Sequence, residues 1–388
     1  MPIYHCLGEI PRKRHIQFRK PDGNLYSEEL FGSEGFSGTS SLLYHLRPPT
    51  QVRRVSLRKR LEWDAANDPT IRHRHMRTAR LPAQSDPVEG RRALLYNDDV
   101  AISLAVPARK QDFFYRDGQG DELVYVSEGT GVLESSFGDI AYRHGDYVVI
   151  PRGTIHRWRT DDVPHRLLVI ESRGQVRTPQ RYRNRSGQLL EHAPFCERDI
   201  RRPASLRTHD ETGEFEVRVK QRNAIYSYVY ASHPFDLIGW DGYLYPWALS
   251  IHDFEPITGR LHQPPPVHQT FESDGFVICS FVPRLYDYHP EAIPVPYHHT
   301  NAGTDEVIYY ANGSFMSRRG IEYGSVTLHP DGIPHGPHPG TIESSLGRKS
   351  TEELAVMIDA MRPLTVSRAA EEIDDPDYPA SWLVPGDR

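Results

Sequence analysis

The stretches DELVYVSEG (residues 121–129) and DEVIYYANG (residues 305–313) repeat one pattern within a single chain. A second shared pattern follows each of them, GDYVVIPRGTIH at 145–156 and GSVTLHPDGIPH at 324–335, and both obey G-x5-P-x-G-x2-H. Within each pattern, glutamate, glycine, proline and histidine recur at the same offsets. Self-similarity of this kind indicates a duplicated structural unit. We therefore expect two related domains, each carrying the same glutamate and histidine.

Short runs rich in Val, Ile, Tyr and Phe predict that the chain is mainly β. They are LVYVSEG (123–129), YVVIPRG (147–153), RLLVIES (166–172), AIYSYVYAS (224–232), FVICSFV (276–282) and VIYYANG (307–313). These residue types favour strands, and 32 prolines and 29 glycines divide the chain into short segments joined by turns.

One segment, TEELAVMIDAM at 351–361, predicts a helix. Thr351 could cap it, and Leu354, Met357, Ile358 and Met361 would share one face. We expect this helix to pack against the outside of a β-domain.

The composition is typical of an ordinary globular protein. The 388 residues suit one large or two medium domains, and 46 basic against 52 acidic residues give a net charge of -6. The chain has no long apolar run, and Arg12, Lys13 and Arg14 stand where a signal peptide needs an apolar core. With three widely spaced cysteines, these features predict a cytoplasmic protein without disulfides or a membrane span.

Charge is distributed unevenly between the two ends of the chain. Residues 1–80 hold 15 basic and 8 acidic residues, whereas 351–388 hold 3 and 9, so the ends could pair. The basic end has no nucleic-acid-binding motif, so we expect no nucleic-acid partner. His73 and His75 form an HxH pair flanked by arginines, which we interpret as a solvated surface stretch.

The paired patterns resemble those of the cupin superfamily, in which glutamate and histidine face the interior of a jelly-roll barrel. The resemblance implies a mainly β bicupin of two cupin-like jelly-roll barrels with few helices. The predicted units are an N-terminal arm with the first strands (1–80), an N-terminal barrel (81–220), a C-terminal barrel (221–365) and an acidic tail (366–388).

A metal site is predicted in the second barrel alone. His298 or His299 precedes Glu306, and His335 follows, whereas the first half has Tyr115 in place of a histidine. We therefore expect the first barrel to be metal-free and Glu122 and His156 to form a residual hydrogen-bonded pair. Two histidines and one carboxylate leave coordination positions open, as in non-haem Fe(II) oxygenases.

The second half also resembles the homogentisate 1,2-dioxygenase family. The resemblance rests on Tyr297-His298-His299 before Glu306, on Leu328-His329 and on Pro334-His335-Gly336-Pro337, and it extends to stretches at 13–45, 233–247 and 276–284. It implies Fe(II) as the cofactor, with His299, Glu306 and His335 as its ligands. One extra residue before Glu306 leaves the choice between His298 and His299 open.

The resemblance also implies roles for other residues. His262, in RLHQPPPV, would accept a proton from the substrate hydroxyl, and Tyr297, Asn301, Phe315 and His329 would lie around the substrate. Phe315 stands where the family's tyrosine is expected, and Thr300 where the family tends to have arginine. The polar contacts of the pocket are therefore expected to differ.

The implied activity is cleavage of homogentisate by O2 to maleylacetoacetate, in tyrosine and phenylalanine catabolism. The expected partners are a small aromatic acid and O2, and the family implies a homo-oligomer, a trimer or hexamer. One alternative is a ring-cleaving dioxygenase of the same architecture for gentisate or a substituted homogentisate. Another is a bicupin that binds a ligand without catalysis.

Overall fold

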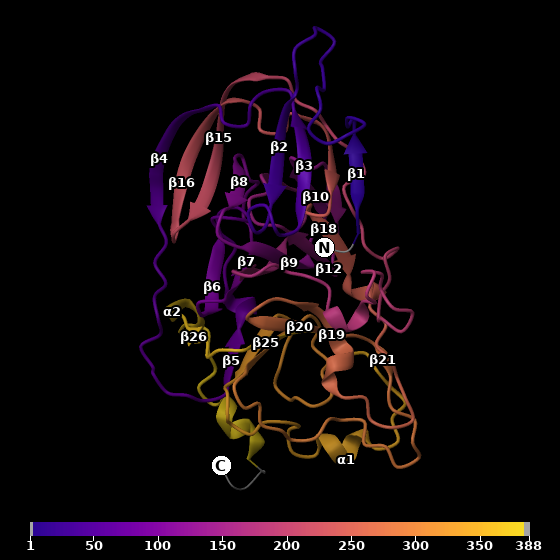
Figure 1. Ribbon diagram of the computed structural model, residues 1–388. Helices are drawn as coiled ribbons and strands as arrows, with labels where there is room; N and C mark the ends of the chain where they lie inside the picture. Colours follow the sequence, from indigo (N-terminus) through magenta and orange to yellow (C-terminus); the bar gives the residue numbers. More distant parts are fainter. Residues whose placement is uncertain (1–2, 384–388) are drawn as a thin grey trace.

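The two copies of the repeated pattern form the central strands of two stacked β-barrels, seen one above the other in Figure 1. The computed structural model describes residues 3–383. Each of the six apolar runs identified in the sequence lies largely within a strand, and the prediction of a mainly β, two-barrel fold is confirmed.

The N-terminal barrel consists of two seven-stranded sheets. The first has the order β18 (Trp247–Ser250), β12 (Asp146–Ile150), β9 (Asp121–Glu128), β14 (Arg166–Ser172), β7 (Val100–Ala105), β6 (Arg91–Tyr96) and β26 (Thr365–Val366). The second has the order β11 (Ile140–Tyr142), β10 (Gly131–Ser135), β13 (His156–Thr160), β8 (Phe114–Asp117), β15 (Thr212–Gln221), β16 (Ala224–Ser232) and β4 (Val52–Arg60).

The C-terminal barrel is built on one six-stranded sheet. Its order is β19 (Gln269–Glu272), β20 (Phe276–Phe281), β25 (Ala355–Ala360), β22 (Asp305–Tyr310), β23 (Ser325–His329) and β5 (Arg74–Arg77). Loops complete this half, together with the ladder of β21 (Arg284–Leu285) and β24 (Ser350–Thr351) and the short helix α1 (Thr341–Ser345).

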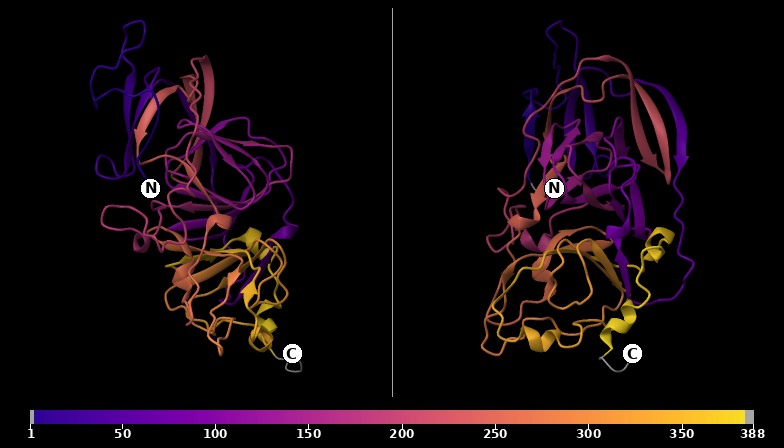
Figure 2. Two further views of the ribbon diagram at one scale, coloured as in Figure 1. Left: turned by 90° about the vertical axis from the view of Figure 1, so that its right-hand side faces the viewer. Right: turned by 180° about the vertical axis from the view of Figure 1, so that it is seen from behind.

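A separate four-stranded sheet stands beside the N-terminal barrel, as the left view of Figure 2 shows. Its order is β1 (His5–Gly8), β17 (Leu237–Gly242), β3 (Ser40–His45) and β2 (Ser27–Gly32). The remaining helices are short: α2 (Arg368–Glu371), η1 (Thr78–Arg80), η2 (Gln180–Tyr182), η3 (Ile251–Asp253), η4 (Pro265–His268) and η5 (Tyr378–Trp382). None of the helices within residues 3–383 has the length and apolar character needed to cross a membrane.

Strands β9 and β22 are buried on both faces, which explains their nearly continuous apolar sequences. Successive side chains of a strand point to opposite faces. In β22, Val307 and Tyr309 face the first barrel, and Tyr309 packs 6.1 Å from Tyr125 of β9, centroid to centroid. The alternate residue Glu306 consequently points into the second barrel.

The predicted helix at 351–361 is wrong, because its centre is strand β25. That strand pairs with β20 on one side and β22 on the other. In strand geometry Val356 and Ile358 join the core between the barrels, and Ala355 and Met357 face the barrel interior. Pairing with a strand on each side and burial of apolar side chains on both faces stabilise the strand more than the modest helical preference of this segment stabilises a helix.

The interpretation of His73 and His75 as a solvated stretch is also wrong. Strand β5 contains His75, which is 1% exposed, and pairs with β23 at the edge of the C-terminal sheet. The oppositely charged chain ends do pair: Arg72 and Arg74 each lie 2.7 Å from Asp374, and Arg77 lies 2.7 Å from Asp375. These ion pairs neutralise the arginines that suggested a solvated surface.

Hydrogen bonding between strands does not follow chain order. Strand β5, from the predicted N-terminal arm, belongs to the C-terminal sheet, and β17 and β18, from the predicted C-terminal unit, pair with strands of the N-terminal half. The domain limits drawn from the sequence remain a prediction.

A buried ion network fills the interior of the N-terminal barrel. The Arg91 guanidinium contacts the carboxylates of both Glu122 and Glu171, and Lys220 Nζ lies 2.8 Å from Glu171 and 3.2 Å from Asp117. Although burial opposes charge on these groups, the neighbouring carboxylates raise the pKa of Lys220 well above its usual value. The absence of a metal from this barrel remains a prediction.

Replacement of Arg91 should destabilise the protein markedly. Arg91→Met would leave Glu122 and Glu171 buried without their shared cation, which typically costs about 3–5 kcal/mol. Urea unfolding of this variant and of Arg54→Met would measure the difference. The control removes an exposed pair with Glu214, whose loss should cost about 0.5 kcal/mol or less. Equal stability of the two variants would contradict a structural role for Arg91.

Candidate metal centre

His299, Glu306 and His335 come together at one end of the C-terminal sheet. Glu306 lies on β22, His335 follows β23, and His299 precedes β22. The backbones of the two histidines form an antiparallel bridge, in which each N–H donates to the other's carbonyl over 2.9 Å. This bridge places the two imidazole rings 4.3 Å apart, centroid to centroid.

Backbone carbonyls fix the orientation of both imidazoles. Nδ1 of His299 lies 3.2 Å from the carbonyl of Tyr297, and Nδ1 of His335 lies 3.2 Å from the carbonyl of Ile333. A carbonyl can only accept, so each Nδ1 must carry the hydrogen. In the neutral rings, the lone pair is therefore on Nε2, and both Nε2 atoms point toward Glu306 at distances of 3.6 and 3.4 Å.

These atoms fit a metal cation. One ligand atom from each residue lies within 4.8 Å of the others, and Nε2 of His335 is buried without a hydrogen-bond partner among residues 3–383. Although burial opposes ionisation, the surrounding histidines hold the pKa of Glu306 well below its usual value. Two imidazoles and a carboxylate that converge in this way form a donor set of the kind that binds a divalent transition metal.

His298 does not join this cluster. Its side chain is exposed, and its backbone lies so close to Gly336 that a Cβ at position 336 would come within 2.7 Å of the His298 Cα. Glycine at 336 therefore permits the close approach of the two segments that carry His299 and His335. Of the two histidines that the sequence left open, His299 is the one that the geometry brings to Glu306.

His329 lies behind Glu306 rather than in the cavity. Its Nδ1 donates to Glu306 Oε1 over 2.7 Å, its ring stacks on His335 at 4.6 Å, and Nε2 is 3.5 Å from the Tyr378 hydroxyl. Complete burial lowers the pKa of His329 to about 3, so the ring is neutral. His329 therefore orients the carboxylate, a role that is common around metal ligands.

A cavity of about 370 Å³ opens beside the cluster. Its lining includes His299 and Glu306 together with four residues predicted from the sequence, which are His262, Tyr297, Asn301 and Phe315. The Tyr297 ring lies between two histidines, 5.4 Å from the ring of His262 and 6.4 Å from that of His299. The cavity thus joins the candidate proton acceptor to the candidate metal site.

Several polar residues that line this cavity were missed by the sequence reasoning, among them Asp287, Arg318 and Asp359. Asp287 lies 3.3 Å from Nδ1 of His262. Arg318 is 8% exposed; its Nη1 donates to the carbonyl of Gly336 over 2.6 Å, and its Nε has no hydrogen-bond partner within residues 3–383. Burial raises the pKa of Asp359 to about 7.

One sequence signal could have revealed Asp359. Extending the internal repeat aligns VIES at 169–172 with MIDA at 357–360, which matches Glu171 with Asp359. Arg318 and Asp287 lie in loops without a repeated pattern, so no comparable signal exists for them.

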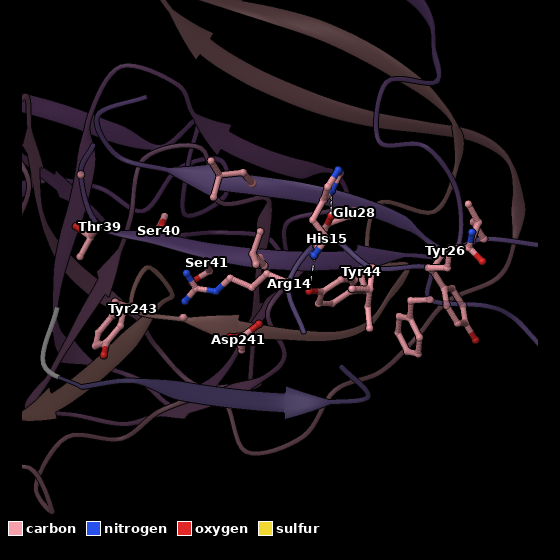
Figure 3. A pocket seen from close by; sticks show the side chains of 18 residues that line it. Arg14, His15, Tyr26, Glu28, Thr39, Ser40, Ser41, Tyr44, Asp241 and Tyr243 are labelled. Atoms are coloured by element: carbon pink, nitrogen blue, oxygen red, sulfur yellow. Dashed lines mark hydrogen bonds and ion pairs between the residues drawn. The ribbon is translucent and has the colours of Figure 1, made fainter. Parts of the chain in front are cut away.

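A larger cavity, of about 1020 Å³, lies on the four-stranded sheet and is shown in Figure 3. Arg14, His15, Glu28, Tyr44 and Asp241 are among its lining residues, and none of the predicted site residues is. We therefore assign the chemistry to the smaller cavity.

Comparison with known proteins agrees with this geometry. Residues 10–251 match the sequence profile described as the N-terminal part of homogentisate 1,2-dioxygenase. The chain belongs to the homogentisate 1,2-dioxygenase family. This agrees with the family resemblance seen in the sequence.

Individual relatives extend the match over the full length of this family member. A protein of Saccharolobus solfataricus provisionally named a dioxygenase is 45% identical over 98% of this chain and 99% of its own. A homogentisate 1,2-dioxygenase of Rhodopseudomonas palustris is 26% identical over 97% of this chain and 90% of its own. A solved cupin 2 conserved barrel domain protein from Leptotrichia buccalis covers 78% of this chain and 100% of its own, with 12% identity and a TM-score of 0.34.

Removal of the His329 side chain should weaken metal binding. His329→Ala deprives Glu306 of its orienting hydrogen bond, and the loss of such a partner typically costs about 10- to 100-fold in metal affinity. Competition with a chelator, followed by metal analysis, would measure the change. His192→Ala, which alters an exposed histidine, should bind as the wild type does. An unchanged affinity in His329→Ala would show that Glu306 needs no such support.

Proposed function

We propose that this protein is an Fe(II)-dependent dioxygenase that cleaves the ring of homogentisate to maleylacetoacetate. The observation that carries the proposal is the convergence of His299, Glu306 and His335 beside a cavity that also holds His262. Membership of the homogentisate 1,2-dioxygenase family supports the reaction class. A role in tyrosine and phenylalanine catabolism in the cytoplasm, and assembly into a trimer or hexamer, form part of the same proposal.

The donor set suits Fe(II), because imidazole and carboxylate ligands bind this ion and three protein ligands leave positions open. Bound iron would supply a Lewis acid and a route for electrons between an aromatic substrate and O2. The chain itself supplies the geometry of the site, its charge and its proton acceptor.

His262 is suited to accept the substrate's phenolic proton. The Asp287 carboxylate can only accept a hydrogen bond, so Nδ1 of a neutral His262 donates to it across 3.3 Å. Nε2 is then left as an acceptor. A base held in one orientation by a carboxylate is a recurrent arrangement for proton transfer.

Arg318 supports an acidic substrate. It is a buried guanidinium in the cavity lining, and within residues 3–383 its Nη1 contacts are to neutral oxygens rather than to a carboxylate. A buried cation without a paired anion favours a negatively charged ligand. The carboxylate of an aromatic acid satisfies this requirement.

Phe315 favours a second candidate within the same reaction class. Its ring lines the cavity and packs 5.0 Å from Tyr310 and 5.7 Å from Phe281, centroid to centroid. An apolar wall at the position where the family's tyrosine is expected tolerates a different ring substituent. Gentisate or a substituted homogentisate is therefore the alternative substrate.

Oxygen uptake by the iron-loaded protein tests the function. We expect about one iron per chain and O2 consumption with homogentisate, because the described donor set holds one ion. His335→Ala should lose both iron and uptake, whereas His298→Ala, the matched exposed control, should retain them. Uptake with gentisate alone would select the alternative substrate. Absence of uptake with either acid would favour a binding protein without catalysis.

Substitution of His262 should separate proton transfer from metal binding. His262→Ala is expected to keep its iron and to lower kcat by about a hundredfold to ten-thousandfold, the usual cost of losing a general base. Steady-state O2 uptake and metal analysis would measure the two effects. Loss of iron would make His262 a ligand, and an unchanged kcat would reduce it to a surface residue of its proline-rich loop.

A further inference from the structure

Asp359 lies directly beside the metal-site carboxylate. The register of β22 and β25 pairs Glu306 with Asp359, and side chains of paired residues lie on the same face of a sheet. Both therefore point into the C-terminal barrel, where Asp359 lines the cavity. Its Oδ1 is buried and has no hydrogen-bond partner among residues 3–383. A polar atom left open in this way indicates a partner that is not part of the chain.

The N-terminal barrel shows how such a pair is satisfied when the chain provides the partner. Glu122 and Glu171 occupy the same paired positions on β9 and β14. There, the Arg91 guanidinium contacts both carboxylates, and Lys220 pairs with Glu171. Asp359 has no equivalent cation in the part of the chain that the structure describes. The two barrels therefore share the same pair of carboxyl groups on adjacent strands, but the cations that contact Glu171 have no counterpart at Asp359 within residues 3–383.

Arg318 and Asp359 approach Glu306 from opposite sides. In the sheet order, β25 flanks β22 on one side and β23 on the other. Asp359 lies on β25, whereas Arg318 donates to Gly336, which follows β23. Consider an aromatic acid whose ring lies over Glu306 and whose carboxylate contacts Arg318. The edge of the ring far from that carboxylate then faces Asp359.

Apart from the neighbouring Glu306, apolar side chains lie near Asp359 in the cavity wall. Met357 follows the same face of β25, and Ile308 and Phe315 lie in the same cluster of apolar side chains. A ring hydroxyl directed into this region would meet Asp359, because the neighbouring Glu306 is already in contact with His299, His329 and His335. Recognition of a hydroxyl by a buried polar group discriminates strongly against an analogue that lacks it.

We propose that Asp359 is a specificity-determining residue that accepts a hydrogen bond from the second ring hydroxyl, the one para to the hydroxyl at the metal. The inference rests on the proposed function and adds to it the feature by which the protein selects a para-dihydroxylated ring. Asp359 is a contact for the substrate and not a metal ligand.

Anaerobic calorimetric titration of the iron-loaded protein tests this inference without turnover. The two probes are homogentisate and 2-hydroxyphenylacetate, which lacks the second hydroxyl. The wild type should bind homogentisate about tenfold more tightly, the upper end of the usual contribution of one hydrogen bond. Asp359→Leu should bring the two Kd values within about twofold of each other. Asp359→Asn keeps an uncharged acceptor and should give an intermediate ratio.

Met357→Leu is the matched control, because it changes the shape of the same wall without removing an acceptor, and its ratio should equal that of the wild type. An unchanged ratio in Asp359→Leu would overturn the inference and leave the proposed function intact. Loss of iron from both Asp359 variants would overturn it in favour of a ligand role. If neither probe bound to the wild type, the proposed function itself would fail, and the inference with it.

Discussion

The face-to-face packing of the two central sheets fixes both the shape of the molecule and the direction of its metal-site carboxylate. The hydroxyl of Tyr309 donates to Ser127 Oγ over 2.6 Å, and the hydroxyl of Tyr147 lies 2.8 Å from Ser280 Oγ. These bonds join the barrels within the apolar core between the two sheets. A slip of β22 by one residue would turn Tyr309 away from its partner and Glu306 into the interface. The alternation of side chains along β22 therefore places Tyr309 in the contact between the barrels and directs Glu306 into the second barrel.

The two barrels share one strand arrangement but surround their central glutamate and histidine with different side chains. His156 and His335 each present Nδ1 to the backbone carbonyl two residues earlier, and in the described part of the chain each has a buried Nε2 without a hydrogen bond. The difference lies in what surrounds them. In the first barrel Tyr115 stands opposite His156, and Arg91 supplies positive charge to the carboxylates. In the second, His299 stands opposite His335, and within residues 3–383 the side chains that contact the Glu306 carboxylate are histidines and not an arginine or lysine.

Much of this arrangement could be predicted from the sequence, because a duplicated pattern constrains several elements at once. Glu306 and His335 were recognisable from their spacing, and the apolar runs around them indicated strands. The helix predicted at 351–361 failed because local periodicity cannot reveal that strands on both sides compete for the segment. Arg318 and Asp287 were missed because their roles depend on contacts between loops, which leave no periodic signal.

Segments from both ends of the chain form the rear wall of the metal site. The His73 ring lies 5.5 Å from that of His329 and 6.0 Å from that of His335, and Trp382 donates through Nε1 to the carbonyl of Gly336 over 3.0 Å. The ion pairs of Arg72 and Arg74 with Asp374 hold the two segments together.

The layer behind the ligands is therefore complete only when residues about 300 positions apart have met. Binding of the proposed cation would consequently favour the docking of both ends, because a cation would stabilise the geometry that these segments enclose. The charge difference between the two ends thus contributes to the integrity of the site, although neither end supplies a ligand.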